Sequence, residues 1–193
     1  LRPDLPPHAA PRITLAAAVA AAEAVREVAG VAAGIKWPND ILVAGRKLCG
    51  ILTEMEAEVD RVGFVVLGIG LNVTLRREQM DPSFRETATS LALEGAPHVR
   101  RAALVQAILA RFEPLYDALL GHRFERVLDR WRALSVTLGQ AVRVLGLDGQ
   151  PVVEAVAEEV DPEGALLVRD GAGRVHRVVS GEVSLRPAPG AGQ

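Results

Sequence analysis

The sequence predicts an α+β fold in which a mixed sheet is covered by helices and is followed by a small β-barrel. Two observations indicate this fold class. Apolar residues recur with a helical period before and after a run of extended segments between Lys36 and Val73. From Gly139 onward the period changes to two, and turn residues interrupt the chain at short intervals. A chain of 193 residues with 49% hydrophobic content can form one large domain, or a medium and a small one.

Composition and charge narrow the function classes. The formal net charge is −2, and no basic stripe with interleaved aromatic residues occurs, so we expect no nucleic-acid partner. The single cysteine, Cys49, excludes an intrachain disulfide and fits a reducing compartment, so a cytoplasmic location is expected. The alanine-rich run Leu15–Ala22 is too short to span a bilayer and is followed by Glu23. We therefore expect neither a membrane segment nor a cleaved signal sequence.

The first predicted element is a helix. Prolines in Leu1–Pro11 favour an extended or irregular start. Thr14 is suited to cap a helix that runs to about Ala29 and ends at Gly30. Its apolar side predicts that this helix covers one face of the sheet, and its many alanines allow close contact.

Three extended segments follow. Ile41–Val43 is a short apolar run, and Ala44-Gly45 is a tight connection typical of a hairpin. Arg46–Glu58 and Val62–Val73 then form a longer pair, joined around Asp60-Arg61. These segments are the predicted centre of the fold.

Alternation along the last strand predicts two different faces. The bulky face should pack on the core, and it consists of Val65, Leu67, Ile69, Leu71 and Val73. The opposite face narrows to Gly68, Gly70 and Asn72. Paired glycines often mark the close approach of a ligand or another backbone. They predict a floor without side chains, with the Asn72 amide at its end; the alternative is a bulge or a helix that crosses over the glycines.

The preceding strand contributes a cation. Lys47 is predicted to start the mostly apolar face that also holds Cys49, Ile51, Thr53 and Met55. An ammonium with a reduced water shell suits recognition of a carboxylate or phosphate, and Asp40 could pair with it across the hairpin. The alternative is a strand-end lysine that extends into solvent. We expect the Cys49 thiol to be buried and inert.

The remainder of the chain is predicted as helices and then short strands. Thr74–Gly95 is irregular, with a helical turn at Ala88–Leu93. Val99–Leu120 has helical periodicity in which Pro114 should cause a kink or a break, and Phe124–Leu134 is a further helix. The predicted barrel strands are Ala141–Leu145, Val152–Val160, Ala165–Arg169, Val175–Val179 and Glu182–Leu185.

The turns between the barrel strands are the second part of that prediction. They are Asp148-Gly149, Asp161–Gly164, Asp170–Gly173 and Ser180-Gly181, and a tail from Pro187 to Gln193 is expected to be disordered. The predicted domains are residues 1–136 and 137–187, with a tail over 188–193.

Three motifs resemble those of one known family. KWPND spans Lys36–Asp40, RKLCGIL begins at Arg46, and GIGLNV begins at Gly68. In this order and spacing they resemble the biotin–protein ligase family, also called biotin–acetyl-CoA-carboxylase ligase, of the monofunctional type. The resemblance implies a class II synthetase-like catalytic domain and an SH3-like barrel. It also implies ATP and Mg2+ as cofactors, biotin as substrate, and a biotin carboxyl-carrier domain of a carboxylase as partner.

The resemblance also implies roles for individual residues. Lys47 matches the lysine that contacts the biotin carboxylate and the α-phosphate, and Asp40 matches the acid that supports this lysine and the acceptor lysine. Asn72 matches the asparagine that faces the nucleotide. The other implied substrate-binding residues are Lys36, Trp37, Asn39, Gly50, Ile51, Gly68 and Gly70. No metal-binding residue is predicted.

One departure from the family pattern shapes the expectation for activity. Family members carry an arginine- and glycine-rich loop and a Ser/Thr-Asn segment upstream of the first helix, and neither occurs in these 193 residues. We expect the N-terminal part of the catalytic domain to be lacking and this chain alone to be inactive. The alternatives are a lipoate- or octanoate-type acyl ligase, or a non-catalytic fragment that only binds a partner or dimerises. A homodimer is the remaining partner prediction.

Overall fold

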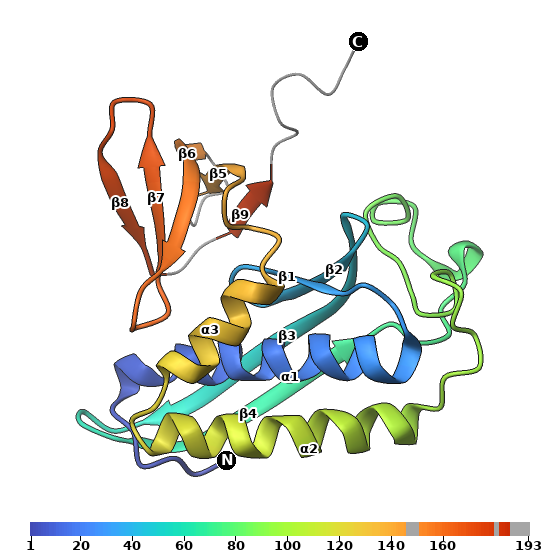
Figure 1. Cartoon of the computed structure of the whole chain (residues 1–193), viewed down its shortest axis with the longest axis horizontal. Coiled ribbons are helices and arrows are strands. Elements are labelled where there is room, and N and C mark those ends of the chain that lie inside the picture. Colours follow the sequence, from blue (N-terminus) through green and yellow to red (C-terminus); the bar gives the residue numbers. More distant parts are fainter. Residues whose placement is uncertain (146–150, 180–181, 186–193) are drawn as a thin grey trace.

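The protein, described by a computed structural model over residues 1–145, 151–179 and 182–185, has an α+β fold with two antiparallel sheets (Figure 1). The first sheet has the order β1-β2-β3-β4, with strands Gly34–Lys36, Asp40–Val43, Arg46–Ala57 and Val62–Leu71. The second has the order β8-β7-β6-β5-β9, with strands β5 to β9 at Ala141–Leu145, Pro151–Val160, Leu166–Asp170, Val175–Val178 and Glu182–Leu185. The predicted turns at Asp148-Gly149 and Ser180-Gly181 and the tail from Pro187 lie outside the described residues.

The first sheet is antiparallel in every ladder of the described strands, so the prediction of a mixed sheet is wrong. Consecutive strands are joined by short turns, which permit only antiparallel pairing. Ala44 and Gly45 both have positive φ, at 48° and 77°, as a two-residue hairpin turn requires. Strand β1 was not predicted because three residues are too few to show an alternating pattern.

Helix α1, Pro11–Ala29, packs on the first sheet and lies beside helix α2, Arg101–Leu120 (Figure 1). It begins at Pro11, whose fixed φ suits the first helical position, and not after Thr14 as predicted. The Thr14 hydroxyl instead lies 2.8 Å from that of Thr53 on β3. The helix ends at Gly30 as predicted, with φ of 66°. The alanines of α1 between Ala16 and Ala24 are fully buried, which allows the sheet and α2 to approach it closely.

Two further predictions about helical segments need correction. Helix α2 continues through Pro114 without a break, because Phe112 and Leu115 are both buried and keep the helix packed on either side of the proline. The segment Ala88–Leu93 is helical only at its end, where the Glu94 N–H donates to the Ser90 carbonyl at 3.0 Å and closes a single turn; at its start Ala88 forms an isolated bridge to Lys47. Helix α3, Glu125–Leu134, then leads into the second sheet.

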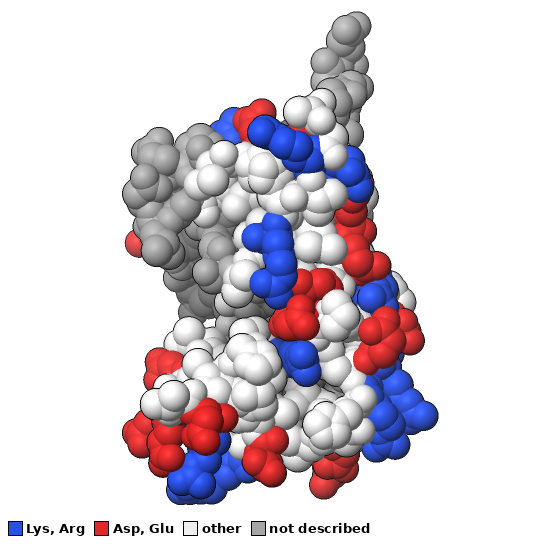
Figure 2. Space-filling model, turned by 90° about the vertical axis from the view of Figure 1, so that its left-hand side faces the viewer, with Lys and Arg blue, Asp and Glu red and all other residues white. Residues whose placement is uncertain are grey.

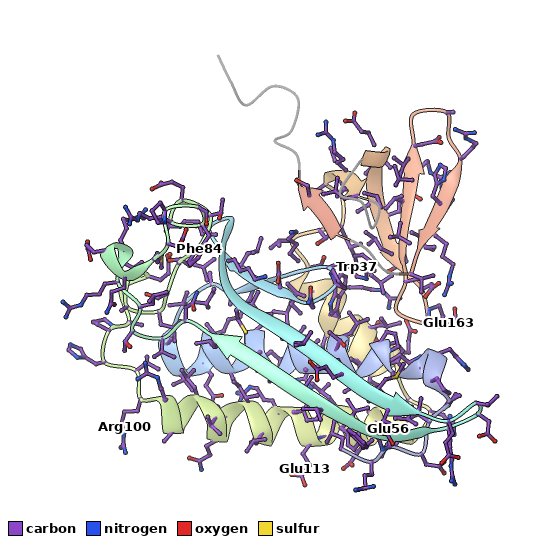
Figure 3. The ribbon with its side chains drawn as sticks, turned by 180° about the vertical axis from the view of Figure 1, so that it is seen from behind. Trp37, Glu56, Phe84, Arg100, Glu113 and Glu163 are labelled. Carbon is purple, nitrogen blue, oxygen red and sulfur yellow. The ribbon has the colours of Figure 1, made fainter. Side chains whose placement is uncertain are left out.

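The two sheets are joined through Trp37, which is 1% exposed. Its backbone N–H donates to the Thr137 hydroxyl at 2.9 Å, and its indole N–H donates to the Gly164 carbonyl at 3.1 Å. Figure 3 shows Trp37 between the first sheet and the second, with Glu163 on the loop beside Gly164. The second sheet is therefore docked on the first by buried hydrogen bonds.

Charges of both signs are interspersed on the face drawn in Figure 2, in keeping with the small net charge. Arginines of the second sheet form ion pairs with its carboxylates, such as Arg169 with Glu158 at 2.6 Å. No helix within the described residues combines the length and hydrophobicity needed to cross a membrane.

Candidate ligand-binding site

A β-bulge at the start of β3 determines where Lys47 lies. Ile41 on β2 pairs with Cys49, but the next residue, Leu42, pairs with Lys47, so Leu48 is the extra residue. Leu48 and Cys49 are both buried, which strict alternation does not allow. The prediction that Lys47 shares the face of Cys49 is therefore wrong. The bulge turns Lys47 to the side of Gly50.

Lys47 is held there by Asp40. The Lys47 Nζ atom lies 2.6 Å from Asp40 Oδ1, and Lys36 Nζ lies 3.9 Å from Asp40 Oδ2. The side chain of Lys47 is 50% exposed, whereas those of Asp40 and Lys36 are 15% and 16% exposed. A cation held in place by a shielded carboxylate keeps donors free for an anionic ligand.

These two are the only lysines in the chain. The sequence has 22 basic residues, of which Lys36 and Lys47 are the lysines and the other 20 are arginines. An ammonium is a compact point charge, whereas a guanidinium is broad and planar. In a chain whose other basic residues are arginines, both lysines lie beside Asp40. This clustering indicates an anion-binding site independently of the sequence motifs.

A cavity of about 550 Å³ lies over the glycines of β3 and β4. Its lining residues are Asn39, Lys47, Gly50, Ile51, Leu52, Gly68, Ile69 and Gly70. Gly50 pairs with Gly70 and Leu52 with Gly68 in unbroken register, so no bulge accounts for these glycines. Gly68 and Gly70 are exposed, so no described helix crosses over them. Gly68 and Gly70 therefore form a surface without side chains, whereas its use as the floor of a ligand site stays a prediction.

A second cavity, of about 430 Å³, meets the first at Lys47. Its lining residues are Lys36, Asp40, Leu42, Gly45, Lys47, Thr87 and Ser184. Two ammonium groups and one carboxylate give these described lining residues a net charge of +1. The two cavities thus differ in chemistry: the first has an aliphatic and glycine lining that suits an apolar ligand, and the second is cationic and suits phosphate.

Of the remaining predicted residues, Asn39 and Ile51 lie at the first cavity, whereas Asn72 and Trp37 do not. The Asn39 carboxamide donates to the Ile51 carbonyl at 2.8 Å, and the Ile51 N–H donates to the Asn39 carbonyl at 2.9 Å, so the two close one side of the first cavity. Asn72 and Trp37 line neither cavity in the described part of the chain. The Asn72 carboxamide donates to the Thr89 carbonyl at 3.0 Å, while Trp37 belongs to the junction between the sheets.

The sequence did not reveal every residue at the cavities. Thr87 comes from an irregular segment and Ser184 from β9, and no local pattern connects either of them to Lys47. Cys49 agrees with its prediction: burial raises the pKa of its thiol to about 12, and the neighbouring Asp40 adds to the effect. The thiol is therefore protonated and inert near neutral pH.

Comparison with known proteins adds to this geometry. The model of the Biotin/lipoate A/B protein ligase family matches residues 1–133, and that of the Biotin protein ligase C terminal domain matches residues 137–186. The Bifunctional ligase/repressor BirA of Bacillus subtilis is 38% identical over 96% of this chain and 56% of its own length. The Biotin--[acetyl-CoA-carboxylase] ligase of Mycobacterium tuberculosis is 37% identical over 93% of this chain and 64% of its own length.

Solved structures share the fold. The biotin protein ligase from Aquifex aeolicus in complex with biotin and ATP has a TM-score of 0.74 and 24% identity, and the match covers 91% of this chain and 71% of that one. The chain spans between half and two thirds of the length of the curated relatives described above.

Proposed function

The chain belongs to the biotin/lipoate A/B protein ligase family, and we propose that it binds biotin and ATP and ligates biotin to a lysine of a biotin carboxyl-carrier domain. The observation that carries the proposal is the position of Lys47. Its ammonium stands where an aliphatic, glycine-floored cavity meets a cationic one. Relatives named as biotin ligases, and a similar fold solved with biotin and ATP, support the same reading.

The first proposed step joins two anions. The ring system of biotin occupies the glycine-floored cavity with its carboxylate toward Lys47, and the phosphates of ATP occupy the cationic cavity. A carboxylate oxygen attacks the α-phosphorus, the bond to the β-phosphate oxygen breaks, and pyrophosphate leaves. Lys47 reduces the repulsion between the two anions and stabilises the charge of the transition state. Lys36 adds positive charge on the nucleotide side.

The second proposed step transfers the acyl group. The acceptor lysine, as a neutral amine, attacks the carbonyl carbon of biotinyl-5′-AMP, AMP leaves, and the amine loses its proton. Asp40 is the carboxylate nearest to Lys47, so we assign it the roles of orienting Lys47 and of attracting the incoming ammonium before it loses its proton.

Magnesium enters this proposal as part of the MgATP substrate. The described residues contain no group of three or more His, Cys, Asp or Glu side chains that could hold a metal ion. Asp40, the carboxylate of the cationic cavity, is already engaged by two ammonium groups. The described side chains therefore do not fit a resident metal ion, and no step depends on one.

Finer features are part of the same proposal. We propose that residues 1–136 form the catalytic domain and that the second sheet, within residues 137–187, closes as an SH3-like barrel. The docking of this sheet through Trp37 and the presence of Ser184 at the cationic cavity support a role in closing the nucleotide side. A homodimer and a cytoplasmic location stay predictions.

The test uses the complete protein that carries this chain. It is incubated with ATP and biotin, and pyrophosphate release is measured, followed by transfer of biotin to a carrier domain. Parallel reactions with lipoate and with octanoate separate biotin ligation from the other acyl ligations of the family. Turnover with lipoate alone, or calorimetric binding of neither biotin nor ATP, contradicts the proposal.

A further inference from the structure

A segment outside the sheet holds the backbone of Lys47 through both its N–H and its carbonyl. The Lys47 N–H donates to the Thr87 carbonyl at 2.7 Å, and the Lys47 carbonyl accepts from the Thr89 N–H at 2.9 Å. The residue between them, Ala88, forms an isolated parallel bridge with Lys47. The bulge at Leu48 leaves this part of β3 irregular, and the Thr87–Thr89 segment fixes its conformation.

The same segment holds Asn72, just beyond the end of β4. The Asn72 carboxamide donates to the Thr89 carbonyl at 3.0 Å, and the Leu91 N–H donates to the Asn72 carbonyl at 3.0 Å. Thr89 therefore bonds to Lys47 through its N–H and to Asn72 through its carbonyl. Thr89 thus links the ammonium-bearing strand to the residue whose amide the family resemblance places toward the nucleotide, in addition to the direct bond from the Asn72 N–H to the Leu48 carbonyl at 3.0 Å.

Thr89 is in turn fixed by Glu94. The Thr89 side chain is fully buried, and its hydroxyl donates to Glu94 Oε1 in a short hydrogen bond. The same oxygen accepts from Arg46 Nη2 at 2.7 Å, and the Glu94 side chain is only 12% exposed. Because Arg46 directly precedes Lys47, Glu94 ties the segment back to the start of β3. A shielded carboxylate with two donors makes a strong and specific anchor.

We propose that Thr89 and Glu94 are positioning residues for the adenylation step, a role that rests on the proposed function. Neither residue lines the two cavities in the described part of the chain, so neither is assigned a contact with substrate. They act through the backbone of Lys47, whose ammonium the proposed function places at the reacting groups, and Asn72 anchors the same segment to the end of β4. A displacement of about 1 Å in such a site costs about a hundredfold in rate.

The discriminating pair is Thr89→Val and Thr89→Ser in the complete protein that carries this chain. Valine keeps the shape of threonine but removes the donor to Glu94, whereas serine keeps the donor and removes one methyl group. We expect Thr89→Val to lower the kcat of biotin-dependent pyrophosphate release by about tenfold to a hundredfold. Thr89→Ser should keep most of the wild-type kcat.

Biotin affinity distinguishes a positioning role from a merely structural one, because only a structural defect would lower kcat and biotin affinity together. No residue from Thr87 to Glu94 lines the glycine-floored cavity, and biotin meets Lys47 there only through its carboxylate, so the biotin Kd of Thr89→Val, measured by calorimetry, should change much less than kcat. Glu94→Gln is the second variant. Its amide oxygen can still accept from the Thr89 hydroxyl while the ionic bond to Arg46 is lost, and we expect a smaller decrease in kcat.

The outcomes separate the inference from the function on which it rests. A wild-type protein without biotin-dependent pyrophosphate release refutes the proposed function itself. An active wild type with unchanged kcat in Thr89→Val overturns only the positioning role. If Thr89→Val loses biotin affinity, melting temperature and kcat together, Thr89 is simply a structural residue and the inference is also overturned.

Discussion

Replacing Lys47 by methionine tests the centre of the proposed site. Methionine keeps the unbranched stem and removes the charge that lies 2.6 Å from Asp40. Lys47 is 50% exposed, and Asp40 retains Lys36 at 3.9 Å, so the change in stability should stay within about 1 kcal/mol. Loss of a charge contact made in the transition state should instead cost about 3–4 kcal/mol, or about 10²–10³ in the rate of adenylation. The effect on rate therefore exceeds the effect on stability.

The assay is biotin-dependent pyrophosphate release by the complete protein that carries this chain, with the melting temperature measured on the same samples. Lys47→Arg is the matched variant, because it keeps the positive charge but replaces a compact ammonium by a planar guanidinium. We expect Lys47→Arg to keep the wild-type stability and to recover only part of the rate. Wild-type turnover by Lys47→Met refutes the reasoning, because the proposed chemistry then proceeds without its central cation.

Lysine labelling gives an independent measurement of the same site. Since Lys36 and Lys47 are the only lysines of these 193 residues, mass spectrometry of peptides from this part of the protein assigns any side-chain amine modification to one of two positions. Lys47 is 50% exposed and Lys36 only 16%, so an amine-directed reagent should modify Lys47 first. ATP with biotin should protect it. Preferential modification of Lys36, or no protection, would place the ligands elsewhere.

Three further predictions concern the floor, the thiol and the junction. Gly70→Val should weaken biotin binding by about 1–3 kcal/mol in calorimetry with an unchanged melting temperature, because an added Cβ meets the Gly50 carbonyl only at an ordinary 3.6 Å; unaltered affinity would exclude this cavity. Cys49, whose pKa burial raises to about 12, should resist thiol reagents at pH 8 until the protein unfolds, and fast reaction of the native protein would contradict its burial. Trp37→Phe removes the donor to the Gly164 carbonyl and should lower the free energy of unfolding by about 1–3 kcal/mol in urea titrations; unchanged stability would mean that this bond does not couple the sheets.

The antiparallel run of β2, β3 and β4 could be predicted because its signals are local. Ala44-Gly45 and the alternation of Val65 and Gly68 depend on neighbouring residues alone. The junction through Trp37 could not be predicted in the same way. Its indole donates to a carbonyl 127 positions along the chain, and no period or turn pattern relates two such distant points. Local patterns thus predict the strands longer than β1, while the contacts that join the sheets arise from tertiary packing.

At Lys47, the central residue of the proposed site, period-two strand alternation predicted the wrong face. Period-two alternation placed it with Cys49, but the bulge at Leu48 moves it to the opposite face. The bulge depends on the pairing of β2 with β3 and on the Thr87–Thr89 segment, neither of which is encoded within the strand itself.

The bulge at Leu48 and the glycine at position 50 together allow the Lys47 ammonium to reach Asp40. The Lys47 stem must cross the strand to reach Asp40, and a Cβ at Gly50 would stand 3.2 Å from Lys47 Cε and 3.4 Å from Nζ. Without the bulge, the ammonium would point into the core beside Cys49, where burial of a charge is costly. With a larger residue at position 50, the ammonium would have to shift away from the carboxylate. The bulge at Leu48, which strand alternation does not predict, therefore allows Lys47, Asp40 and the glycine floor to share one face of the sheet.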